Sequence, residues 1–210
     1  SFQLSTRWAK EVSPTNALKE YPRPGLVRTA WQNLNGLWSY AITEKDAGVP
    51  KEWSGQILVP YPLESALSGV KRSLQPSQHL WYKRTFNSKP IAPNSKVLLH
   101  FGAVDYQCWV YLNGEEVGSH EGGYTSFSFD ITPELKEGAN ELVVKVYDPS
   151  DAGIGPRGKQ VLNPQNIYYT PSSGIWQTVW LQTEPTKHIT ALTITPDLGP
   201  SAVTVTGQSP

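Results

Sequence analysis

The chain has 210 residues, enough for one large domain or two small ones with a substantial buried core. Its 18 Lys and Arg residues balance its 18 Asp and Glu residues, so it lacks the positive charge on which nonspecific binding to nucleic acids or anionic membranes depends. With 17 Gly, 18 Pro and 38% hydrophobic residues, the composition predicts a globular protein with many turns between short elements.

The chain divides into three parts. We expect an N-terminal arm over residues 1–27 and one β-sandwich over residues 28–187. Residues 188–210 contain two further alternating runs with no other strands to pair with, so they are predicted to open a second domain.

Within residues 28–187, most apolar runs are short, rich in Val, Tyr and Trp, and bounded by turn residues, which is typical of strands. In the run Tyr106–Leu112, Trp109 and Tyr111 lie opposite the apolar face, so a neighbouring domain is expected to cover them. The Asn113–Gly114 pair that follows predicts a hairpin turn. The predicted strands are Leu37–Ile42, Gln56–Val59, His79–Phe86, Lys96–Phe101, Tyr106–Leu112, Glu115–His120, Tyr124–Phe129, Glu141–Tyr147, Trp176–Gln182, Ile189–Thr195 and Ala202–Thr206.

The proline-rich segment Val59–Ser65 leaves a predicted strand and carries Glu64. A rigid loop of this kind can aim a carboxylate at a ligand, and a cap or loop hydrogen bond is an equally good interpretation of Glu64. Other carboxylates that could form an acid/base pair are expected to be mostly solvated strand ends: Asp105, Glu115, Glu116, Glu121 and Asp130.

A long segment, Asp148–Ser173, is broken repeatedly by Gly and Pro. It exceeds the usual connector of a compact domain, and loops of this length are usually functional or disordered. Its start, Asp148–Asp151, is better explained as a turn than as a calcium site.

The same loop carries a group of aromatic, amide and basic side chains that suits a polyhydroxylated ligand. A packed loop with two exposed basic residues is the alternative. The group contains Arg157, Lys159, Gln165, Asn166, Tyr168 and Tyr169. The two basic residues also raise the possibility of a substrate carboxylate.

No nucleotide, cofactor or metal motif is present. The single cysteine, Cys108, excludes an intrachain disulfide and a Cys-based zinc motif, and the four histidines are far apart in the sequence. No run of about 20 apolar residues predicts a membrane span. We therefore expect neither a cofactor nor a metal.

Several ordered blocks resemble the N-terminal sugar-binding domain of glycoside hydrolase family 2, which includes β-galactosidases, β-glucuronidases and β-mannosidases. The similarity extends from about Pro24 to Pro185. The blocks are Arg28–Trp38, Val59–Ser65, Leu67–Val70, Leu80–Phe86, Leu99–Tyr106, Val110–Gly114, Glu121–Phe127, Phe129–Thr132 and Ser173–Leu181.

The resemblance implies an all-β jelly-roll sandwich of the galactose-binding type, followed by an immunoglobulin-like sandwich and a (β/α)₈ barrel. Family members are retaining enzymes whose two glutamates lie in the barrel, so this chain is expected to hold no catalytic residue and to lend loops to a carbohydrate pocket. The alternatives are a stand-alone carbohydrate-binding module and a purely structural sandwich.

One position departs from the family pattern. Galactosidase and glucuronidase members commonly place an Asp six residues before the Gly that corresponds to Gly174, and this chain has Tyr168 there. Stacking of Tyr168 on the sugar is the hypothesis that replaces the carboxylate. The segment Ile167–Trp176 looks more like members from polysaccharide-degrading gut bacteria, which implies a periplasmic or secreted enzyme.

Overall fold

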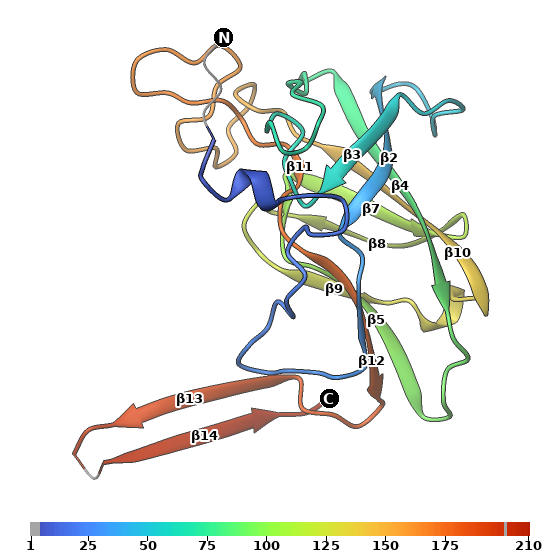
Figure 1. Cartoon of the computed structure of the whole chain (residues 1–210), viewed down its shortest axis with the longest axis vertical. Coiled ribbons are helices and arrows are strands. Elements are labelled where there is room, and N and C mark those ends of the chain that lie inside the picture. Colours follow the sequence, from blue (N-terminus) through green and yellow to red (C-terminus); the bar gives the residue numbers. More distant parts are fainter. Residues whose placement is uncertain (1–4, 200) are drawn as a thin grey trace.

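A computed structural model describes residues 5–199 and 201–210 and shows two antiparallel sheets packed face to face (Figure 1). The six-stranded sheet has the order β3 (Gly55–Val59), β2 (Gly36–Glu44), β4 (Gln78–Ser88), β10 (Gly138–Tyr147), β7 (Gln107–Leu112) and β8 (Glu115–Glu121). The four-stranded sheet has the order β1 (Trp31–Asn33), β12 (Val179–Pro185), β5 (Ser95–Phe101) and β9 (Phe127–Asp130). The predicted all-β jelly-roll sandwich is confirmed.

Smaller elements complete the fold. A two-stranded ladder joins β6 (Val104–Asp105) to β11 (Gly174–Ile175), and short 3₁₀ turns occupy η1 (Ala9–Glu11) and η2 (Thr132–Glu134). A separate hairpin consists of β13 (Ala191–Asp197) and β14 (Ala202–Gln208).

The core lies between the two sheets and follows the period-two pattern of the strands. Along β10, Leu142, Val144 and Val146 are fully buried. Trp38 of β2 and Tyr82 of β4 also point inward, where their rings pack edge to face with centroids 6.3 Å apart. The apolar strand faces predicted from the sequence therefore form the core.

Lysine side chains cover part of the outer face of the six-stranded sheet. Lys145 Nζ lies 4.0 Å from the Trp109 ring centroid and 5.9 Å from that of Trp81, and Lys45 Nζ lies 3.6 Å from that of Tyr147. Long lysine stems shield aromatic surface while their ammonium groups stay near the ring faces. The expectation that a neighbouring domain covers Trp109 stays a prediction, and part of the cover comes from this sheet.

Two strands of the four-stranded sheet begin three residues later than the sequence predicts. The run Trp176–Gln182 is not one strand, because β11 pairs with β6 before it and β12 begins only at Val179. The run Tyr124–Phe129 contributes to the sheet only from Phe127 onward. Tyr124 is 66% exposed and packs edge to face against Trp176 instead of joining the sheet.

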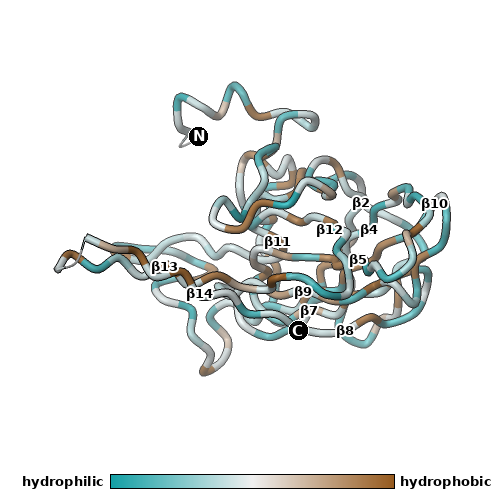
Figure 2. Tube along the Cα trace, turned by 90° about the horizontal axis from the view of Figure 1, so that it is seen from below, coloured by the Kyte–Doolittle hydropathy of each residue, from teal (hydrophilic) through white to brown (hydrophobic). Residues whose placement is uncertain are grey.

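The hairpin of β13 and β14 projects from the sandwich and pairs with no other described strand (Figure 1). Ile194, Val203 and Val205 are 57–61% exposed, and apolar stretches alternate with polar ones along the projecting strands in Figure 2. A two-stranded ribbon is marginally stable alone. The hairpin thus leaves apolar side chains exposed.

Residues 186–190, hereafter the connector, join the sandwich to the hairpin and are held by charged groups. Glu184 of β12 is 3% exposed, its Oε1 accepts a hydrogen bond from Arg28 Nε at 3.1 Å, and its Oε2 forms an ion pair with His188. Arg28 also donates to the carbonyl oxygen of Ile189. Arg28, at the start of the sandwich, therefore fixes the segment that leads into the hairpin, and Arg23 of the N-terminal arm adds a hydrogen bond to the Thr190 carbonyl oxygen at 3.2 Å.

Candidate functional site

The Asp148–Ser173 loop, hereafter the 148–173 loop, runs irregularly from β10 to β11 at the end of the sandwich opposite the hairpin (Figure 1). There it meets the loop that connects β3 to β4, where the Leu63 amide donates to the carbonyl oxygen of Ser173 at 3.1 Å. The two loops that the sequence singled out are therefore adjacent in space.

Glu64 ties these two loops together. Its Oε2 accepts a hydrogen bond from the Ser173 amide at 2.8 Å, and its Oε1 accepts one from the Leu74 amide at 3.5 Å. Burial raises the pKa of Glu64 to about 7, although these hydrogen bonds favour the charged form. The carboxylate thus forms the loop hydrogen bonds that were one of its two interpretations, and a direct ligand contact stays a prediction.

Asp148 anchors the start of the loop to its end. Its Oδ1 accepts from the Ser150 amide at 2.8 Å, as in an Asx turn, and its Oδ2 accepts from the Ser173 hydroxyl at 2.7 Å. Burial raises the pKa of Asp148. The predicted turn at Asp148 is confirmed, and its side chain is 5% exposed.

Asp105 of β6 lies on the inner side of the same loop. It is 8% exposed, so it is an exception to the expectation that these carboxylates are mostly solvated strand ends. Burial, with the nearby charge of Asp148, raises the pKa of Asp105 to about 7, and a hydrogen bond from Gln160 partly offsets this. Gln160 Oε1 in turn accepts from the Ser172 amide at 2.6 Å.

Close packing fixes the point where the loop rejoins the sandwich. Gly174 has a φ of +88°, and a Cβ there would lie 2.0 Å from the Tyr82 hydroxyl oxygen. That oxygen accepts a hydrogen bond from the Ile175 amide at 3.1 Å. Only glycine combines this backbone conformation with so close an approach.

Most of the predicted pocket residues of the loop are exposed on its outer side. Tyr168 and Tyr169 are 50% and 52% exposed, and Lys159 is exposed. The Tyr169 amide donates to the carbonyl oxygen of Lys159 at 3.1 Å, which brings these two together. Half-buried Arg157 donates to the carbonyl oxygens of Asp151 and Gly153.

Gln165 and Asn166 form the turn before the two tyrosines. Both side chains are exposed, and the Gln165 carbonyl accepts from the Tyr168 amide at 3.1 Å. The candidate residues from 157 to 169 are therefore exposed except for Arg157, while Glu64 lies beneath the loop.

Sequence reasoning missed three residues at this end. Gln160 bridges Asp105 and the Ser172 amide, Trp176 donates from Nε1 to the Gly123 carbonyl at 2.7 Å, and Tyr124 packs on Trp176. A cavity of about 30 Å³ lies under the loop. No sequence signal locates these residues, because Gln160 and Asp105, Trp176 and Gly123, and Tyr124 and Trp176 are each 52–55 positions apart.

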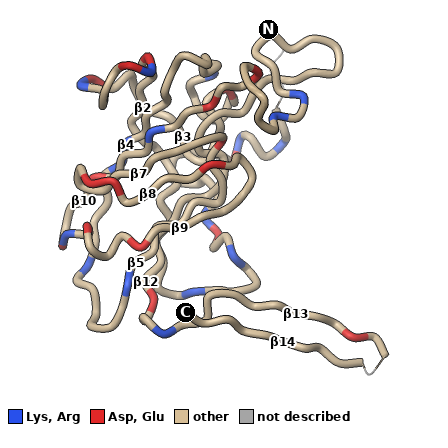
Figure 3. The backbone as a smooth tube through the Cα atoms, turned by 180° about the vertical axis from the view of Figure 1, so that it is seen from behind, with Lys and Arg blue, Asp and Glu red and all other residues tan. Residues whose placement is uncertain are grey.

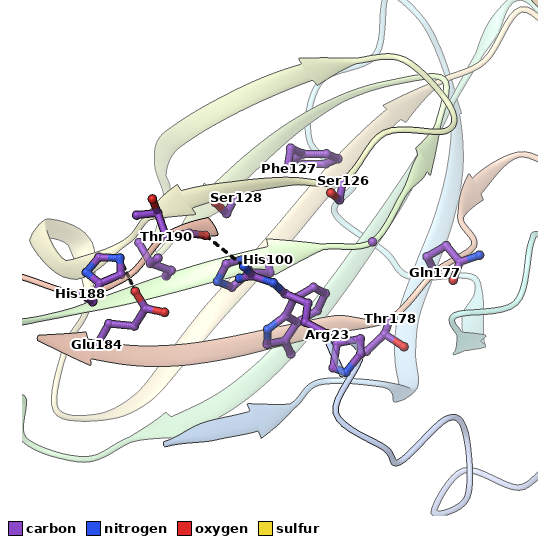
Figure 4. Close-up of a pocket in the computed structure, with 14 residues that line it drawn as sticks. Arg23, His100, Ser126, Phe127, Ser128, Gln177, Thr178, Glu184, His188 and Thr190 are labelled. Atoms are coloured by element: carbon purple, nitrogen blue, oxygen red, sulfur yellow. Dashed lines mark hydrogen bonds and ion pairs between the residues drawn. The ribbon is translucent and has the colours of Figure 1, made fainter. Parts of the chain in front are cut away.

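A larger groove of about 520 Å³ lies on the outer face of the four-stranded sheet (Figure 4). It is lined by Arg23 of the arm, by His100 and Trp180 of the sheet, and by His188 and Thr190 of the connector. Burial lowers the pKa of His100 to about 4, and its ring stacks on Trp180 with centroids 4.7 Å apart. None of the predicted site residues lines this groove.

The described residues contain no cluster of three or more His, Cys, Asp or Glu side chains arranged for a metal ion. Nor does any described helix have the length and apolar character that would span a bilayer. Acidic and basic residues are interspersed along the backbone trace in the view of Figure 3.

Residues 57–185 match the sequence model of the sugar binding domain of glycosyl hydrolases family 2. The chain belongs to this family. It is 38% identical over 111 residues to a β-galactosidase of Thermoanaerobacter pseudethanolicus, covering 52% of this chain and 14% of that protein. It is 35% identical over 187 residues to a β-galactosidase of Priestia megaterium, covering 76% of this chain and 17% of that protein.

Solved structures of the same family share the fold. A β-glucuronidase of Faecalibacterium prausnitzii superposes with a TM-score of 0.63 at 23% identity, covering 90% of this chain and 37% of that one. The chain thus spans well under half the length of the family 2 glycosidases it matches.

Proposed function

We propose that this family 2 chain is the non-catalytic N-terminal sandwich of a retaining exo-β-glycosidase, and that its 148–173 loop forms part of the substrate pocket. The observation that carries the proposal is the construction of that loop. Glu64, Asp148 and Gln160 hold it from beneath, while Tyr168 and Tyr169 remain half exposed on its outer side. An aromatic surface on a rigid support suits stacking against a sugar ring.

The proposed partners of the sandwich belong to the same polypeptide. The exposed apolar residues of the β13–β14 hairpin support its role as the opening of an immunoglobulin-like domain over residues 188–210 and beyond. A following barrel would supply the two carboxyl groups, which lie about 5 to 5.5 Å apart in retaining enzymes. The substrate class is a glycan with a terminal β-linked sugar.

The direct test compares this chain with the longer polypeptide on aryl β-glycosides. We expect turnover of about 1 per second or more from the longer protein, as is typical of enzymes, and none above background from residues 1–210. Turnover by the 210-residue chain at a comparable rate would place catalysis in the sandwich and contradict the proposal. Binding of glycans without hydrolysis by the longer protein would support a carbohydrate-binding module instead.

Lys159 and Arg157 support a narrower proposal, that the terminal sugar carries a carboxylate. Lys159 is exposed, whereas Arg157 is held by loop carbonyls, so Lys159 is the better placed of the two. Substitution Lys159→Ala should reduce kcat/KM on uronic substrates and leave neutral ones unchanged. Equal kinetics on both classes would exclude a role for this charge.

We also propose that the longer protein acts in the periplasm or outside the cell, from the resemblance of residues 167–176 to exported gut-bacterial enzymes. Cell fractionation tests this, and recovery of the activity in the cytoplasm would contradict it.

A further inference from the structure

Two deeply buried carboxylates under the 148–173 loop have no cationic partner. Asp105 is 8% exposed and Asp148 is 5% exposed, and they are close enough for the charge of one to disfavour ionisation of the other. Within residues 5–199 and 201–210, no Lys, Arg or His forms an ion pair with either. Buried charges are normally paired or bound to a metal ion, so this pair is electrostatically incomplete.

A cavity of about 30 Å³ lies between these carboxylates and the loop backbone, and Ser150 also lines it. Ser150 is 7% exposed, and its hydroxyl has no hydrogen-bond partner in the described structure. A buried polar atom without a partner costs free energy and calls for an explanation. The volume is enough for about two water-sized species.

The groups around the cavity favour a positive occupant. Carboxylate and hydroxyl oxygens are hard ligands, and Asp148 keeps lone pairs beyond the hydrogen bonds from Ser150 and Ser173. Arg157 also lines the cavity, but its Nη1 donates to the carbonyl oxygens of Asp151 and Gly153. Its single charge leaves the two carboxylates in excess.

We propose that this cavity binds a hard metal cation, Ca²⁺ in particular, through the carboxylates of Asp105 and Asp148 and the hydroxyl of Ser150. Ca²⁺ tolerates irregular coordination completed by backbone carbonyls and water, as an irregular loop would provide. Two carboxylates form a weakly charged site, so we expect a Kd of about 0.1 to 1 mM, the range of weak extracellular modules. The ion would connect β6 to the start of the loop, independently of any glycosidase activity.

The test is thermal unfolding of the 210-residue chain after removal of metals with EDTA. Titration with CaCl₂ to about 10 mM at constant ionic strength should raise Tm by roughly 5 °C, because a ligand that binds only the folded state stabilises it. Parallel titrations with MgCl₂ and NaCl distinguish Ca²⁺ from other hard cations. A titration with choline chloride controls for screening of charges by salt. No rise in Tm with any of the three metal salts would overturn the proposal.

Variants locate the site. Asp148→Asn should abolish the calcium-dependent rise, and Ser150→Ala, which leaves both carboxylates intact, should increase the Kd about tenfold. Asp151→Asn is the matched control, because Asp151 accepts from the Leu162 amide and does not line the cavity. If Asp148→Asn does not fold, Ser150→Ala decides alone. A rise that is equal in wild type and Ser150→Ala would show surface binding and contradict the assignment.

Discussion

The connector end and the loop end of the sandwich both bury carboxylates, but they differ in how the charge is compensated. Glu184 at the connector end is 3% exposed and has Arg28 and His188 beside it. Asp105 and Asp148 at the loop end are nearly as buried and form no ion pair among the described residues. The connector end is thus complete within the chain, whereas the loop end is complete only with a proton or a bound cation.

This difference matches what each end does in the proposed enzyme. The connector orients the next domain and gains from fixed ion pairs between segments distant in sequence. The loop presents Tyr168 and Tyr169 to a ligand, and its support depends on groups whose charge responds to pH or to an ion. The following substitutions test this contrast.

The largest effect is expected at the connector. Substitution Arg28→Ala should lower the free energy of unfolding by about 3 kcal/mol, because removing the Arg28 cation leaves the buried Glu184 carboxylate with only His188 and the Gln182 amide as partners. Urea unfolding measures this. Lys83→Ala is the control: its pair with Glu141 spans 3.8 Å at the surface, so a loss of about 0 to 1 kcal/mol is expected. Equal losses in the two variants would contradict the contrast.

A smaller, pH-dependent effect is expected at the loop end. The folded chain keeps a proton on Glu64 up to its pKa of about 7, whereas an ordinary glutamate releases it near 4.5. Folding therefore takes up a proton on Glu64 in this window, and the contribution of Glu64 to the free energy of unfolding should fall by about 2 to 3 kcal/mol as pH rises from 4.5 to 7. Asp105, whose pKa is also raised to about 7, adds to the fall in the same direction.

The Glu64→Gln variant tests that assignment, because an amide does not titrate and the slope between pH 4.5 and 7 should become shallower. Exposed Glu115→Gln serves as the control and should keep the wild-type slope. Identical slopes in wild type and Glu64→Gln would show that Glu64 titrates normally.

The smallest effect concerns the point where the loop rejoins the core. Substitution Tyr82→Phe should cost about 1 to 2 kcal/mol, because the buried Ile175 amide loses its acceptor while the ring still fills its place. Chemical denaturation measures this loss in the free energy of unfolding, and the m-value should be unchanged. A neutral result would mean that another acceptor or a water molecule replaces the hydroxyl.

The sheets were largely predictable from the sequence. Alternation in residues 141–147 and the Asn113–Gly114 turn report local preferences that the fold retains in β10, β7 and β8. The short strands β1 and β6 were not predicted, because two or three residues show no period and depend on partners more than 60 positions away.

The site was only partly predictable. The Gly and Pro breaks marked the 148–173 loop, and Tyr168 and Tyr169 are exposed on it as a ligand surface requires. Burial of Asp105 could not be predicted, because it depends on Gln160 and Gly123, which only tertiary structure brings against it. For the same reason the sequence could not show whether Glu64 anchors the loop or contacts a ligand. Its hydrogen bond from the Ser173 amide shows the anchoring role.

The central claim is that the outer side of the 148–173 loop contacts the sugar, and the Tyr168→Ala variant of the longer enzyme tests it most directly. We predict that kcat/KM on the best aryl glycoside falls about tenfold, a factor equivalent to about 1.4 kcal/mol, the upper range for one aromatic contact. The control is Val49→Ala, an exposed residue in the β2–β3 connection at the other end of β3. An unchanged kcat/KM in Tyr168→Ala with normal folding would contradict the account.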